Sequence, residues 1–168
     1  SNETPWGTMK FLHHSNISSV PRVQSIQNAY NLLNRTFEIG GSEIAHREDV
    51  GLLAYSPLAQ GYLTGKYQNG KLPKGSRKEL FNRLQRYEGP YAEEAIEDYL
   101  SIAKKYNIDP SQLANQFVTT RPFVTSNIIG ATNMKQLKLA VTSIEIDLTK
   151  EIENEIEKAF QKHGNVAS

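Results

Sequence analysis

A short, mostly apolar run at residues 50–55, Val-Gly-Leu-Leu-Ala-Tyr, constrains the fold of this chain more than any other segment. Its apolar residues follow one another without strict alternation, and Ser56-Pro57 closes the run. A continuous apolar run of this length is typical of a strand that is buried on both faces of a parallel sheet. The run therefore predicts an α/β fold, because parallel strands are joined by crossover helices.

Helical and extended segments alternate on either side of this run. Extended stretches are expected at residues 23–27 and 127–130. Helices are expected at residues 5–14, 43–47, 78–87, 91–106, 110–121 and 134–141 and after Thr149. The side chains expected to cap them are Thr4, Asp109, either Thr132 or Asn133, and Thr149. This order predicts three parallel strands in one sheet with helices packed against it.

Length and composition narrow the classes of protein to which this chain can belong. The 168 residues suit one domain and fall short of the roughly 250 residues of a complete (β/α)₈ barrel. The formal net charge of +1 gives no global basic excess for nucleic acid or an anionic membrane. The chain has no cysteine, which excludes disulfides and thiolate chemistry, and the histidines have no partner at metal-ligand spacing. No apolar run approaches the roughly 18–20 residues that span a bilayer.

Polar and glycine residues follow each expected strand. In parallel α/β folds the ligand binds at the carboxyl ends of the strands. Gln27 closes the first strand, Tyr55 and Ser56 close the second, and Gly130 is followed by Thr132 at a helix start. A glycine before a helix N-terminus is a favourable place for a phosphate, because free N–H groups and the helix dipole face it. Taken singly, Gln27 is more often a polar strand-end residue than a ligand, and Tyr55 is more often a core residue. Gly130 and Thr132 fit a tight turn and an N-cap equally well.

Three longer motifs resemble one known family. Residues 53–67, Leu-Ala-Tyr-Ser-Pro-Leu-Ala-Gln-Gly-Tyr-Leu-Thr-Gly-Lys-Tyr, are similar to the strand-seven segment of the aldo-keto reductases. They look closest to the branch that holds the Tas-like proteins and the potassium-channel β-subunits. Residues 27–35 resemble that branch's strand-six end, and residues 128–133 with Gln136-Leu137 resemble strand eight and its nucleotide-binding helix. The resemblance covers nearly the whole chain and implies that residues 1–168 are the C-terminal half of a (β/α)₈ TIM barrel.

The resemblance implies that an extended NADPH lies along the carboxyl ends of the strands. Ser1, Asn2 and Gln27 would hydrogen-bond the nicotinamide carboxamide, which offers both donors and an acceptor. Tyr55 would stack on the nicotinamide ring and fix the face that delivers hydride.

The remaining implied contacts reach from the pyrophosphate to the adenosine 2′-phosphate. Ser56 and Leu58 would line the pyrophosphate. The implied phosphate clamp is Lys66, Ser76 and Arg77, and the implied 2′-phosphate site is Gly130, Thr132 and Gln136. The chain departs from the family at Leu139 and Ala140, where members often carry an acidic residue and an asparagine.

The activity that the resemblance implies is NADPH-dependent reduction of an aldehyde or ketone to an alcohol in the cytoplasm. The family's tyrosine acid and its Asp, Lys and His partners come from the part of the barrel before strand five, so no catalytic residue is assigned to this chain. Two alternatives stay open, a nucleotide-sensing regulatory subunit like the channel β-subunits and an inactive fragment.

A half-barrel leaves two sheet edges open, and parallel strands need both faces covered. We therefore expect the chain to pair with an N-terminal half or with itself. The other expected partner is a small carbonyl substrate, and neither nucleic acid nor a membrane is expected.

Overall fold

A three-stranded parallel sheet organises the chain in the computed structural model, which describes residues 1–81 and 85–167. Its strands are β1 (Ser25–Ala29), β2 (Gly51–Tyr55) and β3 (Val124–Ile128), and they lie side by side in sequence order. Ala29 lies opposite Tyr55, and Tyr55 lies opposite Ile128, so the three carboxyl ends meet at one edge. The predicted α/β class with three parallel strands is confirmed, and the arrangement is that of consecutive units of a (β/α)₈ barrel.

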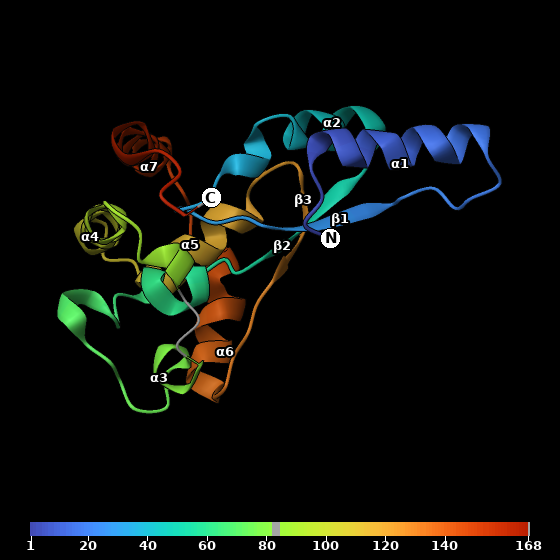
Figure 1. Ribbon diagram of the computed structural model, residues 1–168. Coiled ribbons are helices and arrows are strands. Elements are labelled where there is room, and N and C mark those ends of the chain that lie inside the picture. The colour runs from blue at the N-terminus through green and yellow to red at the C-terminus, as the bar shows by residue number, and fades with distance from the viewer. Residues whose placement is uncertain (82–84, 168) are drawn as a thin grey trace.

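Seven α-helices accompany the sheet in the described residues. They are α1 (Pro5–Ile17), α2 (Gly41–Glu48), α3 (Arg77–Phe81), α4 (Ala92–Lys105), α5 (Pro110–Thr119), α6 (Met134–Val141) and α7 (Lys150–His163). Figure 1 shows α1 and α2 along the β1 side of the sheet, and α4 and α7 as a neighbouring pair seen nearly end-on. None of the described helices is long and apolar enough to cross a membrane.

The helix starts agree with the capping residues predicted from the sequence. Each cap oxygen accepts a backbone N–H from the first turn, which satisfies a donor that the helix itself leaves free. The Thr4 hydroxyl accepts from Gly7 N at 3.1 Å. Of the two candidates for α6, Asn133 is the cap, because its Oδ1 accepts from Gln136 N at 3.0 Å. Asp109 and Thr149 cap α5 and α7 in the same way.

The structure corrects several predicted boundaries. β1 runs over Ser25–Ala29 rather than residues 23–27, so Gln27 lies inside the strand and does not close it. β3 runs over Val124–Ile128 rather than residues 127–130. Pairing with β2 makes Val124-Thr125-Ser126 part of the strand, although Thr125 and Ser126 are polar and do not form an apolar run. Helix α1 continues to Ile17, with Ser15 Oγ bonded to Leu12 O at 2.7 Å. In the predicted helix at 78–87, α3 ends at Phe81 and a 3₁₀ turn covers Gln85–Tyr87, while residues 82–84 lie outside the described residues.

The core lies on one face of the sheet only. Leu52 and Ala54 of β2 are fully buried beneath the helices, together with Phe117 of α5. On the opposite face the aligned row of Gln27 and Ser126 is exposed. In a closed barrel that face points inward, so the open face is the one on which residues at the carboxyl ends can meet a ligand.

Candidate functional site

The carboxyl edge of the sheet brings together three of the residues predicted to hold a nicotinamide. Asn2 N donates to Gln27 O at 2.8 Å, which places the first residues of the chain beside β1, two residues before its end. The Tyr55 hydroxyl at the end of β2 donates to Asn2 Oδ1 at 2.8 Å. Ser1 and the Gln27 side chain are exposed beside them. This cluster offers amide donors, amide acceptors and an oriented aromatic ring within a few ångströms.

A tight loop follows β2. Ser56, Ala59 and Gln60 have φ values of 58°, 48° and 56°, in the left-handed region that non-glycine residues rarely adopt. The loop is held by the buried Asn31, whose Nδ2 donates to Ser56 O at 3.0 Å, and Leu58 packs against the core. Two backbone N–H groups of the loop are used within it, because Ala59 N donates to Ser56 O at 2.9 Å and Gly61 N donates to Leu58 O at 2.8 Å.

The junction between β3 and α6 brings together Thr132 and Gln136. Both the backbone N and the hydroxyl of Thr132 donate to Gln136 Oε1, at 2.9 and 3.0 Å. A hollow of about 470 Å³ opens beside them, lined by Ile129, Ala131, Thr132, Asn133, Met134 and Leu137. A Cβ on Gly130 would meet no atom within 4 Å, so neither crowding nor a left-handed φ accounts for glycine there. The junction leaves backbone close to an open hollow at a helix N-terminus.

The three residues predicted to clamp phosphate have different surroundings. Lys66 Nζ lies over the Tyr67 ring, 5.0 Å from its centroid. Ser76 is buried, and its hydroxyl accepts from Glu79 N at 3.4 Å. Arg77 is exposed at the start of α3. Among the described residues no hydrogen bond or ion pair joins these three side chains, and the phosphate clamp stays a prediction.

Comparison with known proteins decides the family. The model of the Aldo/keto reductase family matches residues 1–161. This chain belongs to the aldo/keto reductase family. It is 46% identical over 161 residues to "Protein tas" of Escherichia coli, and 38% identical over 170 residues to an "Aldo-keto reductase" of Babesia bovis. It is 35% identical over 140 residues to a "Putative voltage-gated potassium channel subunit beta" of Schizosaccharomyces pombe.

These relatives support the branch that the sequence motifs indicated. The matches cover 96%, 96% and 79% of this chain. They cover only 46%, 60% and 40% of the relatives in the same order, so the chain spans about half the length of the proteins it matches.

In this aldo/keto reductase chain, the long loop between β2 and α4 is stabilised by residues that were not predicted from the sequence. Lys78 Nζ forms an ion pair with Glu88 Oε1 at 2.5 Å and lies 5.6 Å from the centroid of the Tyr62 ring. The Tyr62 hydroxyl also donates to Glu88. Hydrogen bonds from Lys78 and then Tyr62 lower the pKa of Glu88, so the carboxylate stays ionised. The partners lie 10 and 26 residues apart, a separation without a sequence signature.

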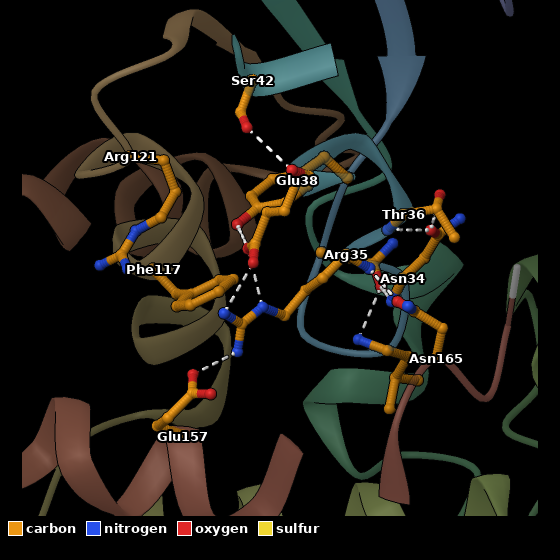
Figure 2. Close-up of polar contacts among 12 residues, drawn as sticks. Asn34, Arg35, Thr36, Glu38, Ser42, Phe117, Arg121, Glu157 and Asn165 are labelled. Carbon is orange, nitrogen blue, oxygen red and sulfur yellow. Dashed lines mark hydrogen bonds and ion pairs between the residues drawn. The ribbon is translucent and has the colours of Figure 1, made fainter. Parts of the chain in front are cut away.

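A second missed cluster supports the loop after β1 (Figure 2). The Arg35 guanidinium is almost buried, pairs with Glu38 at 2.7 Å and with Glu157 of α7 at 2.9 Å, and lies 3.9 Å from the centroid of the Phe160 ring. Burial favours loss of its proton, but the hydrogen bonds that Arg35 donates to Glu38 and Glu157 prevail and raise the pKa of Arg35. Arg35 N donates to Asn165 Oδ1 at 2.5 Å, so the C-terminal segment is tied to the same loop.

Proposed function

We propose that this chain supplies the cofactor-binding half of an NADPH-dependent reductase that converts an aldehyde or ketone to an alcohol. The observation that carries the proposal is the cluster of Asn2, Gln27 and Tyr55 at the carboxyl edge of the sheet. Family membership supports oxidoreductase chemistry in general. On the resemblance, residues 1–168 are the C-terminal half of the barrel and the cytoplasm is the proposed location.

The side chains at this edge fit a nicotinamide. The carboxamide of that group has two N–H donors and a carbonyl acceptor, and the amides of Asn2 and Gln27 supply the complementary set. The bond from Tyr55 to Asn2 fixes the phenol ring next to these amides. A ring held in this way is suited to stacking, which would expose one face of the nicotinamide to the substrate.

The same pose extends over the rest of the sheet edge. We propose that Ser56 and Leu58 line the pyrophosphate and that Thr132 and Gln136 face the adenosine 2′-phosphate. Gln136 Oε1 now engages the donors of Thr132. A small rotation of the Gln136 side chain would release the backbone N–H and the hydroxyl of Thr132 for a phosphate oxygen.

In this proposal the chain's own residues bind and orient the cofactor. A bound NADPH supplies the hydride, and the proton for the carbonyl oxygen is proposed to come from the tyrosine that the family carries before strand five. We assign no catalytic residue to residues 1–168. The relatives give the regulatory-subunit alternative no separate support, since the match to the channel subunit covers less of this chain than the match to Protein tas.

Fluorescence titration of the purified chain with NADPH tests the proposal. We expect a saturable change in nicotinamide fluorescence that weakens in Gln27→Leu, because the carboxamide loses a partner, and that persists in Gln24→Leu, a glutamine just before β1 whose Nε2 bonds Arg22 O. NADH should bind more weakly than NADPH if the 2′-phosphate is recognised. Absence of any change at high micromolar NADPH would overturn cofactor binding by this chain.

We also propose that the two edges of the half-barrel are covered by an N-terminal half-barrel. The edge near α1 exposes Trp6, Met9 and Phe11, and the edge near α6 exposes Met134 and Ile144, at 76% and 66%. Large apolar side chains in such numbers are typical of an interface.

Size-exclusion chromatography with light scattering tests the edge proposal. In the absence of a second half-barrel the edges should pair with each other, so the chain should elute above monomer mass. Met134→Lys, which adds charge to one edge, should shift it toward the monomer. A cooperatively folding monomer at all concentrations would overturn the proposal.

A further inference from the structure

A second cavity lies on the helix-covered side of the sheet, away from the edge described above. It has a volume of about 220 Å³ and opens between β1, the start of α1 and the start of α2. Figure 1 shows these two helices running next to each other beside β1. The proposed cofactor site uses the opposite face and the carboxyl ends of the strands, so this cavity has no part in it.

The inner wall of the cavity is apolar. Ile26 of β1, Phe37, Ile44 of α2 and Val50 line it. Gly41 permits this shape, because a Cβ there would lie 2.8 Å from the Phe37 ring and push the ring out of place. An engineered apolar cavity of about 150 Å³ holds a benzene molecule, so 220 Å³ has room for one aromatic ring with a short substituent.

The polar end of the cavity has no free side-chain donor among the described residues. Asn28 Nδ2 donates to Glu3 O at 3.1 Å, while Asn28 Oδ1 is buried within the protein and is not accessible from the cavity. The hydroxyl of Thr8 donates to Thr4 O at 3.0 Å and that of Thr36 to Asn34 Oδ1 at 2.6 Å. The side-chain donors on the wall are therefore engaged within the protein.

The charge at this end is negative. Among the described residues that line the cavity, Glu3 is the only one with an ionisable side chain. The two helix starts would by themselves favour an anion. The Glu3 carboxylate already supplies a negative charge at the start of α1, since its Oε1 accepts a hydrogen bond from Thr4 N at 2.9 Å. A second anion would meet the carboxylate, whereas a cation or a neutral donor would be attracted.

We propose that this cavity is a binding site for a small aromatic primary amine. The ring would lie against Ile26, Phe37 and Val50, and the ammonium would donate to the Glu3 carboxylate. The engaged side-chain donors on the wall leave the ligand to act as the donor, and the single negative charge on the wall selects the cationic form. The proposal is independent of the cofactor site.

Amide chemical shifts of the ¹⁵N-labelled chain test the proposal with benzylamine as the probe. We expect saturable shifts around Phe37 and Ile44. Benzyl alcohol should bind more weakly, and toluene, which has no donor, more weakly still. Benzoate, which has the ring but a negative charge, should not bind. Benzoate binding as tightly as benzylamine, or no saturable shift with benzylamine at low millimolar concentration, would overturn the proposal.

Two variants separate charge from shape. Glu3→Gln keeps the size of the side chain and removes its charge, so benzylamine should bind about tenfold more weakly while benzyl alcohol is little affected. Glu43→Gln is the matched control, because Glu43 is exposed on α2 and pairs with Arg47. Ile44→Phe fills the cavity and should abolish binding of both compounds. Equal loss in Glu3→Gln and Glu43→Gln, or binding retained in a folded Ile44→Phe, would contradict the assignment.

Discussion

The Tyr55 hydroxyl donates a hydrogen bond to Asn2 Oδ1 at 2.8 Å and so joins the end of β2 to a residue 53 positions earlier in the chain. The bond orients both the phenol ring and the amide of Asn2 at the carboxyl edge of the sheet. It is the relationship on which the proposed nicotinamide site depends.

Removal of this bond should weaken cofactor binding without unfolding the chain. Tyr55→Phe keeps the ring and loses the hydroxyl, which on typical hydrogen-bond energies corresponds to about 0.5–1.5 kcal/mol, or a two- to tenfold rise in Kd. Titration with NADPH measures the change. Tyr91→Phe is the control, because Tyr91 is 71% exposed. The same Kd for both variants would show that the bond does not serve the site.

The Arg35 cluster should carry much of the stability of the loop after β1. Arg35→Met keeps apolar contact with Phe160 and leaves the carboxylates of Glu38 and Glu157 without their cation. The two carboxylates are 27% and 47% exposed, so water can solvate them after the change, and the loss of their charge-assisted hydrogen bonds should cost about 1.5–3 kcal/mol of unfolding free energy. Urea denaturation should show a fall of that order. Arg47→Met, which breaks an exposed pair with Glu43, should cost less than about 0.5 kcal/mol.

Two buried asparagines should respond in opposite ways to the same substitution. Asn31 is fully buried, and its amide bonds Ser56 O, Leu33 N and Asn34 N. Asn115 is 1% exposed, and neither of its amide atoms has a partner in the part of the chain that the structure describes. Asn31→Leu should destabilise the chain by about 3 kcal/mol or more, since it leaves several backbone groups unpaired. Asn115→Leu should be neutral or stabilising. A loss of stability in Asn115→Leu as large as that in Asn31→Leu would contradict this difference.

The contact between α4 and α7 should depend on pH through Asp98. Hydrogen bonds from Lys162 at 2.8 Å and His163 at 2.7 Å hold the pKa of Asp98 below its ordinary value. A depressed pKa contributes stability above the pKa of the unfolded chain, and that stability is lost as the pH falls through the folded value. The stability difference between the wild type and Asp98→Asn should therefore be largest above about pH 4 and shrink in more acid solution. Urea midpoints between pH 2 and 6 measure it, and Glu97→Gln, an exposed neighbour, should show no such trend.

The secondary structure of this chain was predictable where the local pattern was strong. The apolar run of β2, the caps at Thr4, Asp109 and Thr149 and the amphipathic face of α4 all act within a few residues of the chain. β3 was misplaced because Val124-Thr125-Ser126 becomes a strand through pairing with β2 and not through its own apolar content. The placement of the predicted site residues has two origins. The chain order puts Gln27 in β1, Tyr55 at the end of β2 and Gly130 just beyond β3, whereas the positions of Lys66, Ser76 and Arg77 depend on how a long loop packs.

The sequence by itself determined the α/β class, the order of the elements and the family, because these depend on short-range periodicity and on motifs that lie within continuous segments. Only the tertiary structure decided which groups meet across the chain. The bond between Tyr55 and Asn2, the ion pair between Arg35 and Glu157 and the unpartnered oxygen of Asn28 each depend on segments brought together by packing. Such contacts leave no periodic signal, since a side chain's partner is set by the helix or strand packed against it rather than by its neighbours in sequence.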